Sequence, residues 1–264
     1  IMVPPTEVPR LAEVDGLNYY PQPAIGPESL WFNLDNEILA NPQVREAIAH
    51  AIDKEGFTEG VLQGTTSPAN THFTTGSWAY DPDAQLPEYD PENAKALLAE
   101  AGYPDGFTIN LTTNQGNFFR EHFVEFAQAE LGKIGIDVVV DKAEWGTFIG
   151  TVMDGTYEMA FYNEEGGIPD PDVAFEYFHT GGPNNYSHYG DAEVDEWLEQ
   201  ARVSADPAER QELYYKVQAK LNEDLPTVPI FWRPNPMVVN AKFDNVVPSG
   251  IHTYGGIHNG CLAE

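Results

Sequence analysis

Four carboxylates, two glycines and two prolines stand together in the stretch NEEGGIPDPDVAF, residues 163–175. The acids are Glu164, Glu165, Asp170 and Asp172, and they follow an apolar run, YEMAFY, that predicts a buried strand. Closely spaced carboxylates can bind calcium, act as a catalytic acid and base, line a ligand site at a strand end, or form a solvated turn. The loop sequence alone leaves these four possibilities open.

The remaining motifs exclude several catalytic and metal sites. The loop departs from the D-x-[DN]-x-[DN]-G pattern of an EF-hand calcium loop. The 7 histidines are scattered without an H-E-x-x-H motif, and the single cysteine, Cys261, can form neither a cysteine-based zinc site nor an internal disulfide. The nucleophile elbow, the Walker loop and the dinucleotide-binding glycine motif are absent from the sequence. We therefore expect no catalytic residue, no metal and no cofactor, although a carboxylate pair for glycoside hydrolysis stays possible among 42 acids.

The excess of acidic residues limits the kinds of molecule that the protein is expected to bind. The chain of 264 residues has 42 acidic and 13 basic residues spread along its length, for a net charge of −29. Nucleic acids and anionic membrane surfaces would be repelled, so neither is an expected partner. The spread of acids fits adaptation to high salt, and the alternative is an acidic exported protein.

No apolar run approaches the roughly 18 residues of a membrane span. The start of the sequence lacks both an initiator methionine and a signal-peptide pattern, and this start predicts a fragment or a processed product.

Local signals predict the elements that must position the acidic loop. Side-chain caps followed by proline mark helix starts at Asn41-Pro42, Asp90-Pro91 and Asp206-Pro207, and Asp191 is a further cap. Alternating or continuous apolar residues predict strands at 107–113, 136–141, 157–162, 227–232 and 236–240. Long helices between such strands predict an α+β (mixed α/β) fold in which the helices pack on a mixed sheet.

Three segments in series carry motifs of one known protein family. Ser29–Gly64 contains Phe32-Asn33, Val44-Arg45 and the run AIDK, as in the first signature of that family. The segment YDPENAKALLAEAGYPDGF, 89–107, is close to a second signature. Residues 189–231 match the paired helices that precede a strand. Each segment alone is an ordinary helix, but the three in order are specific. Together they resemble the solute-binding proteins of ABC importers, in family 5, which handles peptides and nickel.

The resemblance implies a lobe of the periplasmic-binding-protein type II kind. Members of the family are roughly twice this length and close two lobes around a ligand. This chain is similar to the C-terminal half. Residues 1–25 would be the hinge-entering segment of the first lobe, 26–232 the second ligand-binding lobe, and 233–264 the segment that returns toward the first lobe.

The same resemblance makes the acidic loop the edge of a ligand cleft, because the family has a DPD element beside the ligand and Asp170-Pro171-Asp172 aligns with it. Peptide-binding members often carry an aromatic residue and an Asp just before this element. Glu164 and Gly167 stand at those positions here, so dipeptide specificity does not carry over directly. Glu164 and Glu165 are then candidates for contact with a ligand amine, since a carboxylate favours an ammonium group. Turn formation and helix capping are the alternative for Asp170 and Asp172.

Other ligand-binding candidates lie near the loop. Tyr162 and Asn163 end the predicted strand and could face a ligand or the core. Trp145 could stack on a ligand, with core packing as the alternative. Arg120 could receive a ligand carboxylate, with an exposed ion pair as the alternative.

The sequence thus predicts a non-enzymatic solute-binding component of an ABC importer that captures peptides or similar small solutes by clamshell closure. The expected partners are the ligand, the permease subunits and the N-terminal lobe, with the protein itself a monomer. The expected location is extracytoplasmic, with a lipid anchor on an N-terminus that this sequence does not contain. A carboxylate-based hydrolase and a stand-alone interaction module are the alternatives.

Overall fold

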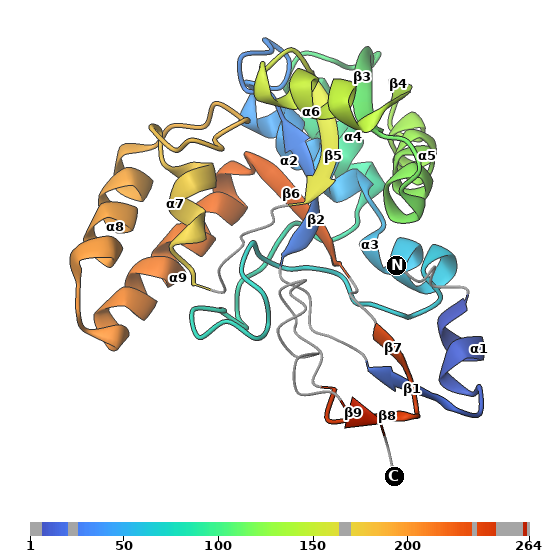
Figure 1. Ribbon diagram of the computed structural model, residues 1–264. Coiled ribbons are helices and arrows are strands. Elements are labelled where there is room, and N and C mark those ends of the chain that lie inside the picture. Colours follow the sequence, from blue (N-terminus) through green and yellow to red (C-terminus); the bar gives the residue numbers. More distant parts are fainter. Residues whose placement is uncertain (1–6, 21–25, 164–169, 234–236, 247–260, 263–264) are drawn as a thin grey trace.

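The computed structural model describes residues 7–20, 26–163, 170–233, 237–246 and 261–262. Its centre is a mixed sheet of five strands in the order β4-β3-β5-β2-β6 (Figure 1). The strands are β2 (Pro27–Phe32), β3 (Phe107–Asn114), β4 (Ile136–Ala143), β5 (Met159–Asn163) and β6 (Thr227–Trp232). β3 runs parallel to β4 and β5, whereas β2 runs antiparallel to β5 and β6. The expected mixed sheet is confirmed, and the predicted strands 107–113, 136–141, 157–162 and 227–232 lie in it with boundaries within two residues. The central strand β2 was not predicted, and the predicted strand 236–240 lies in a separate two-stranded ribbon.

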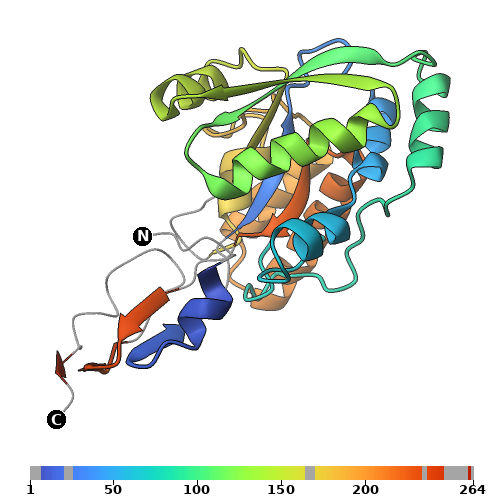
Figure 2. The same cartoon turned by 90° about the vertical axis from the view of Figure 1, so that its right-hand side faces the viewer.

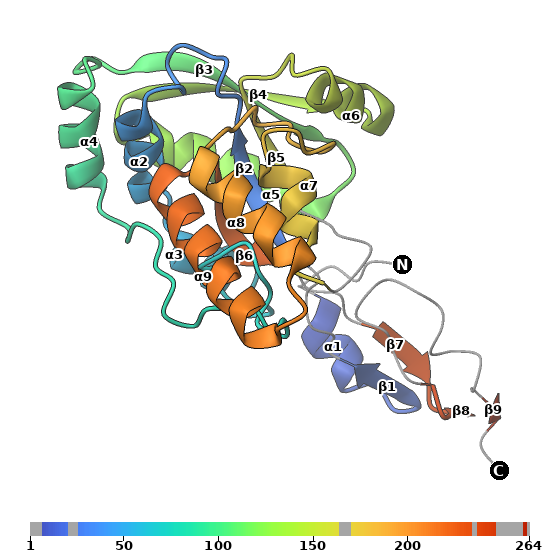
Figure 3. The same ribbon diagram turned by 90° about the vertical axis from the view of Figure 1, so that its left-hand side faces the viewer.

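Helices connect the strands and cover both faces of the sheet. They are α2 (Pro42–Ala51), α3 (Lys54–Gly56) with the π-helical turn η2 (Phe57–Val61), α4 (Pro91–Glu100), α5 (Phe118–Gly132), α6 (Trp145–Met153), α7 (Val173–Phe178), α8 (Ala192–Val203) and α9 (Pro207–Asp224). Figure 2 shows α5 lying across one face, and Figure 3 shows α8 and α9 across the opposite face. Within the described residues, no helix combines the length and the apolar character needed to cross a bilayer.

The capping residues form the predicted local hydrogen bonds. The Asn41 side chain accepts the N–H of Gln43, and the Asp90 side chain accepts the N–H of Asn93. Asp191 and Asp206 cap α8 and α9 in the same way. Each cap satisfies a backbone donor that has no partner within its helix, so the helix starts are encoded locally.

The two faces of the sheet have separate hydrophobic cores, because successive side chains of a strand point to opposite faces. Leu30 and Phe32 of β2 pack toward α2, α4 and α5 in one core. Trp31, between them in sequence, packs in the other core with residues of α6, α7, α8 and α9. All six residues of β2 are buried, as expected for an inner strand covered on both faces.

A small ribbon stands apart from the main sheet. β1 (Leu17–Tyr20) pairs antiparallel with β7 (Met237–Asn240), so segments near the two ends of the chain meet each other. β8 (Phe243–Asp244) pairs with β9 (Cys261–Leu262), and α1 (Val8–Ala12) contacts β1. Figures 2 and 3 show these elements extending away from the helix-covered sheet.

Candidate functional site

Four strands of the main sheet meet at one edge. β3 and β5 are parallel, so their last residues, Asn114 and Asn163, lie at the same edge. β2 is antiparallel and begins there, with Glu28 directly opposite Asn163, and β6 ends there just before Arg233. Ligands of open α/β sheets bind outside the carboxyl ends of parallel strands. We call this edge the strand-end site.

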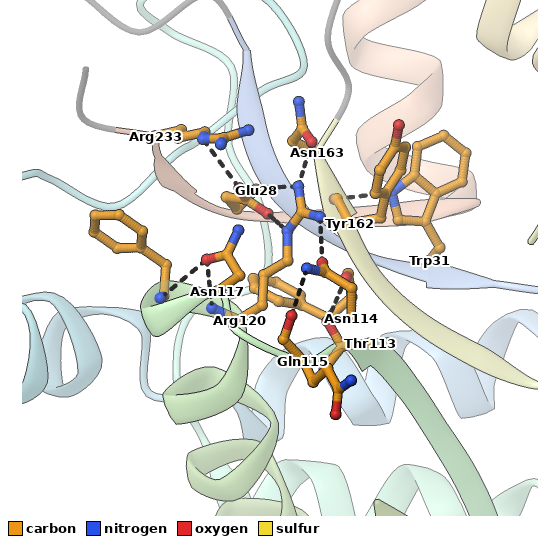
Figure 4. Close-up of polar contacts among 12 residues, drawn as sticks. Glu28, Trp31, Thr113, Asn114, Gln115, Asn117, Arg120, Tyr162, Asn163 and Arg233 are labelled. Carbon is orange, nitrogen blue, oxygen red and sulfur yellow. Dashed lines mark hydrogen bonds and ion pairs between the residues drawn. The ribbon is translucent and has the colours of Figure 1, made fainter. Parts of the chain in front are cut away.

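A buried arginine joins three of these strands (Figure 4). Arg120, in the first turn of α5, donates from Nε to Oε2 of Glu28 at 2.8 Å and from Nη1 to Oδ1 of Asn114 at 2.7 Å. Its Nη2 donates to Oε1 of Glu28 at 3.3 Å and also to Oδ1 of Asn163. Arg233 lies on the other side of the same carboxylate, with its Nε 3.4 Å from Oε1 of Glu28. We call Glu28, Asn114, Arg120, Asn163 and Arg233 the Arg120 network.

Burial determines what the Arg120 network can do. Arg120 is 2% exposed and Glu28 is 0% exposed. Removing one partner of such a buried ion pair typically costs about 3–5 kcal/mol, because the other charge stays buried. The expected ion pair of Arg120 is therefore present, but its expected exposure is wrong, because α5 packs this side chain against the sheet. Direct contact between Arg120 and a ligand carboxylate stays a prediction.

Aromatic rings surround the last residues of β5. Tyr162 is half-buried, and its ring centroid lies 6.3 Å from that of Trp145 and 5.8 Å from that of Phe148. The guanidinium carbon of Arg120 lies 4.9 Å from the centre of the Tyr162 ring, and Nε1 of Trp31 donates to the Tyr162 carbonyl at 3.1 Å. The Tyr162 ring is thus held in place by neighbours on several sides.

Trp145 is the exposed aromatic residue of this group. It is the first residue of α6, and Glu144 caps that helix by accepting the N–H of Gly146. Its side chain is 47% exposed, so the expectation of core packing for Trp145 is wrong. At the start of α6, the Trp145 indole lies at the periphery. Phe148 and Val152 of the same helix fill the core instead. An exposed indole beside Tyr162 offers a flat surface for a planar or apolar ligand group.

The Asp170-Pro171-Asp172 element forms ion pairs with arginines of the helices α8 and α9. Oδ1 of Asp170 accepts the N–H of Asp172 at 2.9 Å, so the predicted turn role of Asp170 is confirmed. Asp170 pairs with Arg210 at 3.0 Å, and Asp172 pairs with both Nε and Nη2 of Arg202. Asp172 stands at the start of α7, but its side chain makes no capping hydrogen bond. Ligand contact by Asp170 stays a prediction.

Two of the predicted ligand-binding residues, Glu164 and Glu165, lie outside the described residues. Among the residues that are described, no group of three or more His, Cys, Asp or Glu side chains could hold a metal ion. Glu28, Asn114 and Arg233 were not expected from the sequence to be part of the site. Glu28 did carry a signal, because a glutamate shortly before the apolar run LWF, if buried there, requires a partner for its charge.

Known proteins resemble this chain in sequence, and solved structures resemble it in fold. The dipeptide-binding protein of Escherichia coli K12 is 28% identical over 232 residues, which are 85% of this chain and 43% of that protein. Heme-binding protein A of Haemophilus influenzae is 29% identical over 206 residues, 75% of this chain and 38% of that protein. A solved structure of the periplasmic binding protein DppA from Helicobacter pylori, in complex with the peptide STSA, has a TM-score of 0.91 and 28% identity. That match covers 100% of this chain and 52% of the other.

These matches confirm the lobe fold that the sequence predicts. The chain spans about half the length of the proteins it matches. Residues 1–186 match the sequence model described as bacterial extracellular solute-binding proteins, family 5 Middle. This chain therefore belongs to the family 5 bacterial extracellular solute-binding proteins.

Proposed function

We propose that residues 26–232 are the second ligand-binding lobe of a protein that captures a peptide or a similar small solute for an ABC importer. Residues 1–25 and 233–264 would connect this lobe to a first lobe, and the protein would act as a monomer. The ligand would stabilise the closed arrangement of the lobes over the open one, with no covalent bond broken. Delivery to permease subunits would then follow on the outer side of the cell membrane, where a lipid anchor would hold the protein.

The observation that carries this proposal is the composition of the strand-end site. A half-buried Tyr162 stands at the carboxyl end of β5, directly before the acidic loop in sequence, and the exposed Trp145 at the start of α6 lies beside its ring. Apolar rings beside a few polar groups are typical of small-molecule sites. The names of two similar proteins, a dipeptide-binding protein and a periplasmic binding protein in complex with a peptide, support a peptide ligand.

We further propose that the ligand carries an amine or another cationic group. Glu164 and Glu165 follow Asn163 in sequence, and an ammonium group would relieve the repulsion between these neighbouring acids. Gly166 and Gly167 allow close approach of a ligand to the backbone. Tyr162, Asn163, Trp145, Asp170 and Arg120 complete the proposed binding residues.

The test is calorimetric titration of the two-lobe protein with dipeptides, the tetrapeptide Ser-Thr-Ser-Ala, N-acetylated forms of both, and heme. We expect the free amine to be required, and the double variant Glu164→Gln with Glu165→Gln to weaken binding by about 1.5–3 kcal/mol. The matched control is Glu193→Gln with Glu196→Gln on α8, which changes the net charge equally and should leave affinity intact.

Three outcomes would contradict the proposal. Equal binding of acetylated and free peptides would remove the amine contact. Turnover of a peptide or glycoside that one carboxylate substitution abolishes would favour a hydrolase. A stable complex with a protein partner, without any small ligand, would favour an interaction module.

A further inference from the structure

The carboxylate of Glu28 is shared by two arginines from distant parts of the chain. Arg120 of α5 binds it at 2.8 Å, and Arg233, which directly follows β6, lies 3.4 Å from it. We infer that Glu28 is a positioning residue that couples the strand-end site to the β1·β7 ribbon. The further statement that the ribbon leads to a first lobe rests on the proposed function.

Glu28 is linked to the strand-end site through Asn163 and Arg120. Glu28 and Asn163 are direct cross-strand neighbours in β2 and β5. Arg120 lies over both and donates to both side chains. The pairing of β2 with β6 shifts register between Glu28 and Ser29, so the regular pairing of the two strands is interrupted beside Glu28. Any displacement of Glu28 must therefore move Arg120, Asn163 or both.

Glu28 is linked toward the ribbon through its position in β2 and through Arg233. Glu28 is the second residue of β2, and the segment before it comes from β1. Arg233 opens the segment that leads from β6 to β7. The backbone N–H of Arg233 also donates to the carbonyl of Gly26 at 3.4 Å. Gly26 and Arg233, the described residues from which the chain leads to β1 and β7, are thus hydrogen-bonded to each other, and Arg233 also pairs with Glu28 (Figure 4).

The interaction of Glu28 with Arg120 and Arg233 depends on the negative charge of its carboxylate. Glu28 is 0% exposed, so water cannot take over the hydrogen bonds of its carboxylate if the charge is lost. A glutamine at this position keeps the shape but presents an amide donor toward groups that are themselves donors. Two guanidinium groups would then lie close together without the anion they share, and the interaction that holds the ribbon segments would weaken.

Hydrogen–deuterium exchange of the two-lobe protein without ligand tests the coupling. In Glu28→Gln we expect amide exchange about tenfold faster than in the wild type, both in β5 and in the ribbon strands 17–20 and 237–240. The matched control is Glu130→Gln on α5, which removes another buried carboxylate that is paired with Lys133 and Tyr89. This control should leave exchange in the ribbon unchanged.

A second variant keeps the test decisive if Glu28→Gln does not fold. Arg233→Gln leaves the pair of Glu28 with Arg120 intact, so we expect faster exchange in the ribbon and unchanged exchange in β5. Ribbon exchange at the wild-type rate in Arg233→Gln would overturn the inference. So would a ribbon that responds equally to Glu130→Gln, because that would show general destabilisation.

Ligand addition separates this inference from the proposed function. With Ser-Thr-Ser-Ala bound, exchange should slow in β5 and in the ribbon of the wild type, but only in β5 of Arg233→Gln. If the peptide binds and protects both regions equally in Arg233→Gln, the coupling through Glu28 is wrong. If no peptide of the panel binds the wild type, the proposed ligand class fails, whereas the ligand-free comparison still decides the coupling.

Discussion

At the scale of single residues, buried charges have structural partners. Arg45, 6% exposed, donates to the carbonyls of Leu39, Ala40, Asp224 and Leu225. Because α9 ends at Asp224, Arg45 satisfies carbonyls that have no partner within that helix. Arg120 plays a comparable part at the sheet edge, where its partners are side chains. The first arginine fixes a helix end, and the second fixes a candidate site.

Lys54 predicts a specific pH dependence of stability. Its Nζ donates to the carbonyl of Ala69, and burial lowers its pKa to about 8, partly offset by Glu55. The folded pKa is below the unfolded value of about 10.4, so the unfolded chain binds more protons between the two values. The free energy of unfolding should therefore rise from pH 8 to pH 10, by about 1–2 kcal/mol after allowance for solvent screening.

Denaturant titrations of the wild type and of Lys54→Met across this pH range measure the effect. The difference in stability between the two proteins should change with pH. Lys95→Met, at an exposed lysine paired with Glu92, is the matched control and should follow the wild type. The attribution to Lys54 fails if Lys54→Met keeps the full rise.

Trp145 predicts a fluorescence signal for ligand binding. Its indole is 47% exposed beside Tyr162, whereas Trp78 is 40% exposed beside Tyr214 and Arg210. A ligand at the strand-end site should change the emission of the wild type and of Trp78→Phe. It should leave the emission of Trp145→Phe nearly unchanged, because a ligand would dehydrate the indole at position 145. An emission change retained in Trp145→Phe and lost in Trp78→Phe would place the ligand elsewhere.

At the scale of elements, two glycines allow β3 and β4 to start side by side. Phe107 and Ile136 are paired at the start of these parallel strands, and Gly106 and Gly135 directly precede them. Gly106 has φ +73°, and a Cβ at this position would lie 1.8 Å from the carbonyl oxygen of Gly135. The close approach of two backbones therefore requires glycine at 106 for both space and conformation.

Gly106→Ala should lower the free energy of unfolding by about 3 kcal/mol or more, from left-handed strain plus the backbone clash. Gly116→Ala is the control, because Gly116 has φ +80° but nothing within 4 Å of its added Cβ. It should cost only about 1–2 kcal/mol. Thermal or urea unfolding measures both. Equal losses would mean that the strand starts separate to accommodate a methyl group.

At the scale of the whole molecule, charge repulsion acts throughout the chain. The net charge of −29 exceeds the magnitude of about 2–8 that is sufficient for solubility of a small domain. The Debye length falls from about 10 Å at 0.1 M salt to about 3 Å at 1 M. The melting temperature should therefore rise across this range in potassium chloride. A flat profile would exclude adaptation to high salt and would leave a generally acidic protein.

The proposed two-lobe arrangement predicts a difference in affinity. This lobe alone should bind its solute far more weakly than the two-lobe protein, because one open wall leaves polar contacts facing water. Calorimetry of both proteins with the same peptide measures the difference. Equal affinities would place the complete site within this lobe and would contradict capture by closure.

Many local features of this protein follow from its amino-acid sequence. Caps such as Asn41 and Asp90, most of the strands, the acidic charge and the family segments could be identified from it, because each depends on residues close together in the chain. The central strand β2 was not predicted. The environment of the site residues, in contrast, depends on tertiary contacts. Arg120 and Glu28 are 92 positions apart in sequence, and Trp145 is exposed although its helix is apolar. Burial and pairing depend on which strands become neighbours and which helix covers them, and sequence periodicity does not specify either.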